Sequence, residues 1–279
     1  SIFSIRPQVV IRPRHKSDVE VVVKTIARET KRFSSLSLTP RAAGTGLGGG
    51  SLTDSIVVDM LHLDKMGDVS VKKDKITFTC EPGLMWRDME KELKKHNLYL
   101  PPYTSSKDIC TIGGSIGNNA AGPDSLRYGH CADWVEALGV VLKDGKTYTI
   151  KPLTLKEFQA LIKQKHEHAR IAQSVYELIV KNEAEIRRNK PKTKKNSAGY
   201  ALWNVIPEGV AAFKKGKGVF DLTRLITGSQ GTIGIVTNIT MRALPIQKNT
   251  TLLMVPIFDL TEAADTVVKS LKYNPINVE

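Results

Sequence analysis

The chain has 279 residues, of which 41% are hydrophobic and 25% charged, and this composition excludes a disordered or fibrous protein. Its formal net charge is +13, and no apolar run approaches the ~18 to 20 residues that a membrane-spanning helix needs. The three cysteines contain no Cys-x-x-Cys spacing, so we expect neither a zinc site nor an iron–sulfur cluster. We expect a cytoplasmic protein without a signal peptide or transmembrane segment, at most peripheral at a membrane.

The first sixty residues predict strands that alternate with one helix. Residues 9–13 form an apolar run that ends in proline, which indicates a short strand. Ser17 precedes Glu20 by three residues, the spacing of a capping box, and apolar residues then recur at helical spacing to about Lys31. Residues 36–39 predict the next strand, and residues 55–59 predict another.

A glycine-rich segment, residues 41–50, lies between these two strands and holds five glycines but no acidic residue. Because glycine lacks a Cβ, its backbone N–H groups can surround an anion, so the segment predicts a phosphate cradle. Gly44, Gly46 and Gly49 fit the pattern G-x-G-x-x-G, but a strand rather than a helix is predicted next, which excludes a dinucleotide fingerprint. No Gly-Lys-Ser/Thr follows, which excludes a P-loop. The alternative to a phosphate cradle, judged from this segment alone, is a flexible glycine loop that binds no ligand.

The rest of the chain predicts a mixture of strands and helices. A hairpin is expected at residues 69–80, and a second, with an Asp144–Gly145 turn, at residues 134–150. Amphipathic spacing predicts helices at residues 84–96 and 155–181, with residues 187–202 as an insertion. The last predicted elements are strands at residues 233–239 and 251–258 and a helix at residues 261–271.

Two more glycine-rich segments follow, at residues 110–122 and 227–236. The second reads T-I-G-G-S-I-G-N-N-A-A-G from Thr111 to Gly122, and the third reads G-S-Q-G-T-I-G-I from Gly228 to Ile235. At these three segments the chain resembles the PCMH-type FAD-binding domain of the vanillyl-alcohol oxidase superfamily. It is most similar to the D-lactate, glycolate and D-2-hydroxyglutarate dehydrogenases, whose third motif carries a glutamate where Gln230 stands here.

This resemblance, which covers about residues 7–245, implies an α+β fold. We expect a two-lobed FAD-binding domain over residues 1–246, with lobes of about 1–63 and 64–246. Residues 247–279 would begin an α+β cap domain that binds substrate in the family. We therefore expect a fragment that lacks most of the cap and the C-terminal part.

The resemblance also implies which residues bind FAD. Backbone amides of the first segment would hold the diphosphate, and the other two segments would line the flavin. No metal is expected. The family's base and carboxylate-binding residues come largely from the cap and C-terminal segment, so no catalytic residue is assigned. The expected FAD-binding residues are Arg41, Ala43, Gly44, Thr45, Gly46, Leu47, Gly48, Pro102, Ser106, Thr111, Gly114, Ser115, Gly117, Asn118, Ala121, Gly122, Gln230, Gly234 and Ile235.

The implied function is oxidation of a small 2-hydroxy acid by hydride transfer to flavin N5, with this fragment inactive alone. We expect non-covalent FAD, with a covalent link at His130 or Cys131 as the alternative. The electron acceptor is left open among a quinone, a flavoprotein and a cytochrome.

Three other functions are the alternatives. A non-catalytic FAD-binding subunit of a larger complex is the runner-up, and an FAD reductase of cell-wall precursor synthesis fits the motifs less well. Nucleic-acid binding is favoured by charge alone. Residues 181–195 hold seven basic and two acidic residues but no aromatic ones for base stacking, so no nucleic-acid partner is expected.

Overall fold

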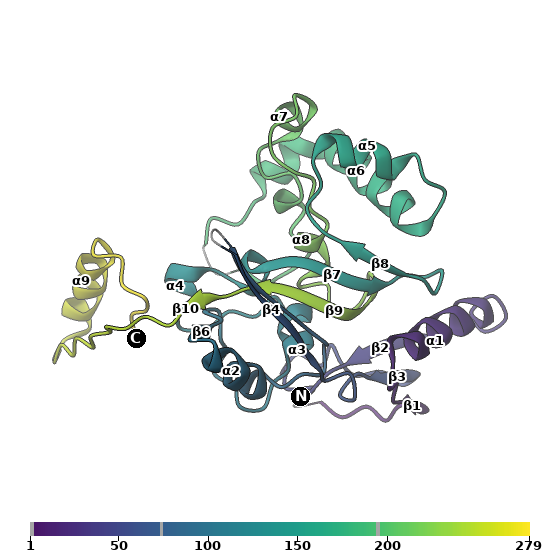
Figure 1. Cartoon of the computed structure of the whole chain (residues 1–279). Helices are drawn as coiled ribbons and strands as arrows, with labels where there is room; N and C mark the ends of the chain where they lie inside the picture. Colours follow the sequence, from purple (N-terminus) through teal and green to yellow (C-terminus); the bar gives the residue numbers. More distant parts are fainter. Residues whose placement is uncertain (1–2, 73–74, 194–195) are drawn as a thin grey trace.

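The computed structural model describes residues 3–72, 75–193 and 196–279. Its described part contains a three-stranded sheet, a five-stranded sheet and a two-stranded pair, with helices packed around them (Figure 1). The predicted mixture of helices and strands is therefore confirmed. Within the described residues, no helix combines the length and the apolar character needed to cross a membrane.

The N-terminal sheet is parallel and has the order β1-β3-β2. Its strands are β1 (Val9–Ile11), β2 (Leu38–Arg41) and β3 (Ile56–Asp59), and α1 (Lys16–Glu29) connects the first two. The Ile-Val-Val run of β3 is buried, as expected for the central strand of a parallel sheet. A strand and no helix follows the first glycine-rich segment, which confirms that this is not a dinucleotide fingerprint.

The predicted start of α1 was wrong. Ser17 is not the N-cap; His15 is, and its backbone N–H donates to the Asp18 carboxylate at 2.9 Å. The carboxylates of Asp18 and Glu20 both lie close enough in sequence to cap this helix, but only Asp18 does so. Glu20 accepts a 3.2 Å hydrogen bond from the backbone N–H of Thr147, in the central sheet.

The central sheet is antiparallel with the order β4-β5-β9-β7-β8. Both predicted hairpins are present in it, as is the strand predicted near residue 235. A two-stranded pair of β6 and β10 extends from its side (Figure 1). The bounds are β4 (Met66–Lys72), β5 (Lys75–Cys80), β6 (Leu98–Tyr99), β7 (Val135–Val141), β8 (Thr147–Ile150), β9 (Ile235–Arg242) and β10 (Leu244–Pro245).

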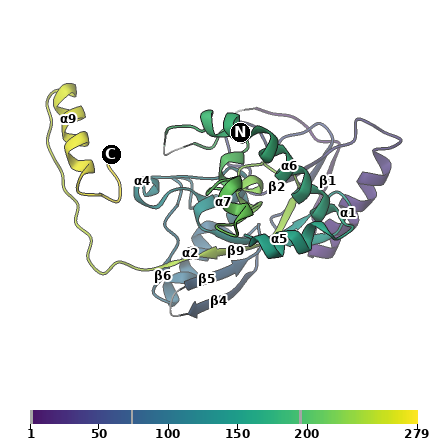
Figure 2. The same cartoon turned by 90° about the horizontal axis from the view of Figure 1, so that it is seen from above.

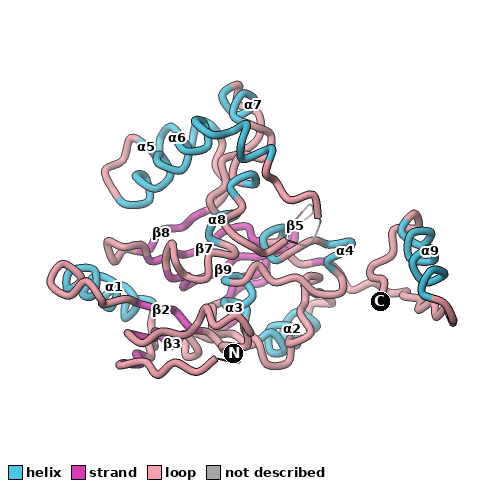
Figure 3. Tube along the Cα trace, turned by 180° about the vertical axis from the view of Figure 1, so that it is seen from behind, coloured by secondary structure: helices cyan, strands magenta, loops and turns pink. Residues whose placement is uncertain are grey.

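Helices cover both faces of this sheet. In Figures 1 and 3, α5 to α7 lie on one side of it, and α2 and α3 lie on the side of the N-terminal sheet. The larger hydrophobic core, with Phe78, Trp86, Leu138 and Phe220 fully or nearly fully buried, fills the space between sheet and helices. These helices are α2 (Trp86–Lys95), α3 (Ile112–Gly117), α4 (Ser125–Tyr128), α5 (Leu155–Ile162), α6 (Glu167–Arg188), α7 (Val210–Lys214) and α8 (Thr223–Ile226), with short 3-10 turns at Cys131–Asp133 and Leu202–Asn204.

The single helix predicted over residues 155–181 was wrong, because the structure has α5 and α6 there instead. Lys163 ends α5, and His166 begins a new helix as its N-cap. Its Nδ1 accepts a 3.1 Å hydrogen bond from the backbone N–H of Ala169. Apolar spacing continues across the break, so periodicity alone does not reveal it.

The C-terminal segment stands apart from the body in two perpendicular views (Figures 1 and 2). The helix α9 (Leu260–Leu271) confirms the prediction, with Asp259 as its N-cap. The strand predicted at residues 251–258 was wrong, because these residues pair with no described strand. Leu252 and Phe258 are consequently exposed, at 82% and 94%.

A second, smaller hydrophobic core joins the two sheets. Val19 and Val23 of α1 and Val58 of β3 pack with Val141 of β7 and Ile235 of β9. This contact fixes the end of the N-terminal sheet against the start of β9. The first glycine-rich segment follows β2 and the third precedes β9, so the junction holds these two segments near each other.

We predict that Val19→Ala destabilises the protein at this junction. Val19 is fully buried, so removing two methyl groups loses their burial and leaves a cavity, which lowers the free energy of unfolding by about 2 kcal/mol. Val21→Ala on the same helix is the matched control, because Val21 is 64% exposed and its change stays within about 0.5 kcal/mol. Urea denaturation of the two variants measures the difference; equal losses would contradict the described packing.

An aromatic cluster at the start of α6 contains a buried histidine. The His168 ring lies 5.7 Å from the Tyr148 ring and 6.1 Å from the His166 ring. Burial, and secondarily the neighbouring His166, lower the pKa of His168 to about 4. His168 therefore stays neutral in the folded protein at a pH where the unfolded chain takes up a proton.

We predict that this histidine makes the protein less stable in mild acid. His168 costs no stability above pH ~6.5, the pKa in the unfolded chain. As the pH falls from there towards about 4, protonation of His168 in the unfolded chain lowers the free energy of unfolding, by at most about 3 kcal/mol. Denaturation midpoints measured through this window should fall less steeply in His168→Leu than in the wild type. Parallel slopes in the two proteins would show that His168 binds protons equally in both states.

Candidate functional site

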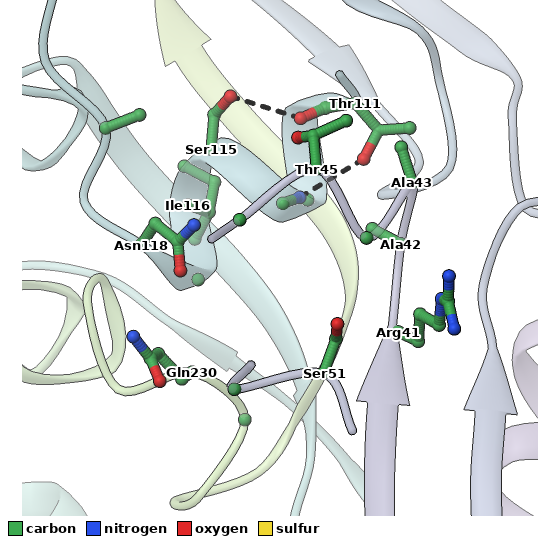
Figure 4. Close-up of a pocket in the computed structure, with 18 of the residues that line it drawn as sticks. Arg41, Ala42, Ala43, Thr45, Ser51, Thr111, Ser115, Ile116, Asn118 and Gln230 are labelled. Atoms are coloured by element: carbon green, nitrogen blue, oxygen red, sulfur yellow. Dashed lines mark hydrogen bonds between the residues drawn. The ribbon is translucent and has the colours of Figure 1, made fainter. Parts of the chain in front are cut away.

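A cavity of about 350 Å³ lies where the three glycine-rich segments meet (Figure 4). The first segment follows β2, the second contains α3, and the third links α8 to β9. Residues far apart in the sequence thus line one site. The cavity opens between the N-terminal sheet and the central sheet, a place where proteins commonly bind ligands.

The first glycine-rich segment presents backbone donors that the protein itself does not use. In the described part of the chain, the N–H groups of Gly44, Thr45, Gly46 and Gly48 donate to no protein acceptor. All four residues line the cavity. A series of unused amides is the arrangement that binds an anion such as a phosphate.

One positive charge accompanies these amides. Arg41 is the single charged side chain among the described residues that line the cavity. Gly44 has a φ of +68°, and a Cβ there would lie 2.8 Å from Arg41 Nε and Nη2. The guanidinium therefore packs against the bend of the segment, and it points away from Asn118 and Gln230 (Figure 4). It supports the bend and adds positive charge to the site.

Part of the second segment is the short helix α3. Thr111 Oγ1 accepts from Gly114 N at 3.2 Å, and Ser115 Oγ donates to Thr111 O at 3.1 Å (Figure 4). These backbone groups are therefore used within the protein. The segment instead offers side chains to the cavity, such as Asn118, whose Nδ2 lies 3.1 Å from where a Cβ on Gly46 would be.

The third segment is bound to the second by backbone hydrogen bonds. Gly228 N donates to Ile116 O at 2.9 Å, and Gln230 N donates to Gly117 O at 3.0 Å. Gln230 has a φ of +53°, in the left-handed region, which turns its side chain towards Gly50 of the first segment. The three segments thus hold one another in place around the cavity.

Most of the expected FAD-binding residues line this cavity. Those that do not are Pro102, Ala121, Gly122 and Ile235. Ile235 is instead part of the junction core, and Gly122 lies against the backbone of Tyr103, where a Cβ would clash. The residues in the lining are Arg41, Ala43, Gly44, Thr45, Gly46, Leu47, Gly48, Ser106, Thr111, Gly114, Ser115, Gly117, Asn118, Gln230 and Gly234.

The structure adds lining residues that the sequence analysis missed. Most are neighbours of the motifs, so extending each motif by a few residues would have found them. Met60, Pro82 and Ser197 lie farther from the three motifs, Ser197 in the expected insertion, so extending the motifs would not have found them. The added residues are Pro40, Ala42, Gly49, Gly50, Ser51, Met60, Pro82, Thr104, Cys110, Gly113, Ile116, Ala120, Ser197, Ile226, Ser229, Gly231 and Val236.

The described lining carries no group suited to be a general base. It contains no His, Asp, Glu, Lys or Tyr, and its one thiol, Cys110, is buried. Within the described residues, no three His, Cys, Asp or Glu side chains gather in a way that would hold a metal ion. The cavity is thus built to bind a ligand through amides and neutral polar groups.

Residues 7–151 match a family model described as an FAD binding domain. This match covers the first and second glycine-rich segments. The cavity fits such a cofactor, because its unused amides suit a diphosphate and its described lining carries no acidic side chain that would repel one. These observations agree with the FAD that the motifs predict.

By name, the curated relatives are dehydrogenases and an oxidase subunit that act on hydroxy acids. The chain is 32% identical over 238 residues to D-2-hydroxyglutarate dehydrogenase of Escherichia coli, covering 85% of this chain and 22% of that protein. It is 27% identical to glycolate oxidase subunit GlcD of Bacillus subtilis, covering 95% and 43% respectively. D-lactate dehydrogenase of Archaeoglobus fulgidus is 26% identical, covering 94% and 44%. The chain therefore spans from about a fifth to less than half of these relatives.

A solved structure of alkyldihydroxyacetonephosphate synthase has a similar fold. Its TM-score is 0.53 at 18% sequence identity, over 86% of this chain and 32% of that chain. The α+β, PCMH-type fold predicted from the motifs is confirmed by this similarity together with the family match.

We predict that Gly44→Ala damages the cradle even without a ligand. An alanine at a φ of +68° is strained and meets the Arg41 side chain, which costs about 1–2 kcal/mol in the free energy of unfolding. Gly48→Ala is the matched control, because no atom lies within 4 Å of a Cβ there and its φ is ordinary, so stability changes by less than about 0.5 kcal/mol. Thermal denaturation distinguishes them; a stable Gly44→Ala would contradict the described backbone.

Proposed function

The chain belongs to the FAD binding domain family, and from this we propose that it is the FAD-binding part of an oxidoreductase that oxidises a small 2-hydroxy acid. One observation carries the proposal. The amides of Gly44, Thr45, Gly46 and Gly48 in the first glycine-rich segment have no acceptor in the described protein, and these residues line a cavity that the second and third segments complete.

The FAD diphosphate is proposed to bind along the first segment. Gly44 to Gly48 supply N–H donors, Thr45 adds a hydroxyl, and the Arg41 guanidinium adds positive charge beside the bend. Hydrogen bonds to a charged acceptor are the stronger kind, so these donors are the main source of affinity.

The rest of the cofactor is proposed to lie against the second and third segments. Asn118 and Gln230 reach the cavity with amide groups that can donate and accept hydrogen bonds. Gly117 and Gly234 lie in the lining, where the absence of a side chain permits close approach. Pro102, Ala121, Gly122 and Ile235 would act behind this surface, by holding the segments in place.

FAD is proposed to be held without a covalent bond. Cys131 is fully buried, and burial raises the pKa of its thiol to about 12, so it is not the thiolate that a covalent link requires. His130 Nε2 already accepts a 3.2 Å hydrogen bond from Asn196 N. Neither residue is in the described cavity lining.

We propose that the chain has the domain division that its motifs predict. The parallel sheet would mark a lobe of about residues 1–63, and the central sheet a lobe of about 64–246. Residues 247–279 would begin a cap domain. Their separation from the body and their exposed apolar side chains support this, because such side chains normally pack against further structure.

The substrate class comes from the relatives' names: D-2-hydroxyglutarate, D-lactate and glycolate are all small 2-hydroxy acids. When bound, FAD supplies the acceptor for the hydride that leaves such an acid. The residues described here bind and orient the cofactor. The proton acceptor and the groups that bind the substrate carboxylate would lie outside the described lining. Electrons would pass on to a quinone, a flavoprotein or a cytochrome, in a cytoplasmic protein that is at most peripheral at a membrane.

A second candidate is an FAD-binding subunit whose partner supplies the catalytic groups. It is favoured by the same lack of an ionisable base in the described lining. In either case the role of this chain is to bind FAD.

We predict that the purified protein binds FAD and releases it on denaturation. Titration should quench flavin fluorescence, and denaturation followed by filtration should leave the flavin in the filtrate. Asn118→Ala should weaken binding about fivefold, because one hydrogen bond is lost. Asn189→Ala is the control, since Asn189 lies at the end of α6, outside the cavity.

A wild-type protein that fails to quench added FAD would overturn the proposal. In the FAD-loaded full-length protein, bleaching of the flavin absorbance by a 2-hydroxy acid separates the enzyme from the binding subunit. No bleaching by D-2-hydroxyglutarate, D-lactate or glycolate would favour the binding subunit.

A further inference from the structure

Residues 196–200 cross the rim of the cavity between α6 and the 3-10 turn at Leu202–Asn204. We call these five residues, Asn-Ser-Ala-Gly-Tyr, the strap. Ser197 lies in the cavity lining, although the sequence places the strap in an insertion far from all three motifs.

The first anchor of the strap is His130. Asn196 N donates to His130 Nε2 at 3.2 Å. The backbone at His130 is itself tied to the second glycine-rich segment, because Cys131 N donates to Ala120 O at 3.0 Å and Ala132 N donates to the Asn119 side chain at 3.0 Å. The start of the strap is therefore fixed to the segment that carries Asn118.

The second anchor is Thr232, in the third glycine-rich segment. The Thr232 hydroxyl donates to Ser229 O at 2.7 Å, so it accepts the 2.7 Å hydrogen bond from the Tyr200 hydroxyl. Ser229 is part of the cavity lining. Between the anchors, Gly199 has a φ of +70°, which lets the strap turn. The strap thus connects the second segment to the third along the cavity rim.

The strap presents one polar side chain without a protein partner. Within the described chain, the Ser197 hydroxyl makes no hydrogen bond, and the residue is exposed at the rim. A ligand in the cavity would cover this hydroxyl and remove it from water. A covered hydroxyl is stable only if the ligand accepts or donates a hydrogen bond.

We propose that the strap closes over FAD, that Ser197 hydrogen-bonds to the bound cofactor, and that His130 and Tyr200 are positioning residues which hold the strap in place. This inference rests on the proposed function. Because a strap closed over FAD has to move before the cofactor leaves, its anchors act chiefly on the rate at which FAD leaves. Loss of one anchoring hydrogen bond should speed FAD release about fivefold.

The test measures FAD release from the loaded protein after dilution, through the recovery of flavin fluorescence. Tyr200→Phe, which keeps the ring and removes only the anchoring hydroxyl, and Ser197→Ala should each release FAD about fivefold faster. His130→Ala should do the same, and His130→Gln, which restores an acceptor, should recover part of the slow release. The matched control is Tyr273→Phe, because Tyr273 lies beyond α9 and 77% of it is exposed.

Proteolysis supplies a second readout that does not depend on these variants folding. Chymotrypsin cleaves after Tyr200, which is 48% exposed, and added FAD should slow this cleavage in the wild type. Cleavage after Tyr273 should continue unchanged.

The outcomes separate this inference from the proposed function. FAD binding with unaltered release in Tyr200→Phe and Ser197→Ala, and with no protection at Tyr200, would overturn the strap alone. A wild-type protein that binds no FAD would overturn the proposed function and the strap with it.

Discussion

The candidate site depends on a stretch of backbone whose N–H groups have no acceptor within the described protein. The amides of Gly44, Thr45, Gly46 and Gly48 belong to neither helix nor strand and find no acceptor in the described protein. Such donors are costly when a ligand or neighbouring chain removes them from water without pairing them. An anion is the partner that pairs several of them at once, so this backbone favours the diphosphate that FAD carries.

Unused donors are useful only if they are held in position. The hydrophobic junction of α1 and β3 with β7 and β9 fixes the first glycine-rich segment against the third. Backbone hydrogen bonds from Gly228 and Gln230 then fix the third against the second. The second contributes α3, whose amides are paired internally, so it behaves as a rigid wall. The cavity therefore has one side that offers backbone donors and two sides that offer shape and polar side chains, in place of three equivalent loops.

The sequence predicted those parts of the fold that depend on local patterns. Alternating apolar residues located both hairpins, and the glycine motifs located most of the cavity lining. The sequence did not predict features for which several local arrangements compete and the pattern alone does not decide between them. Glu20 could have capped α1, but its carboxylate instead accepts a hydrogen bond from Thr147 N. His166 divides one periodic stretch into two helices. Residues 251–258 have a strand's composition but no described strand beside them, so composition alone does not make them one.

Ser197 lies in the cavity lining although it belongs to none of the three glycine motifs. Its neighbours Asn196 and Tyr200 are held by hydrogen bonds to His130 and Thr232, which lie 66 and 32 residues away in the sequence. Those anchors use an imidazole nitrogen and two hydroxyl groups, which occur throughout any protein surface, so no motif marks them. The glycine-rich segments supply shape and donors that are common to a family. The proposed strap, which is built from polar side chains outside those segments, would set how long the bound cofactor stays in the cavity.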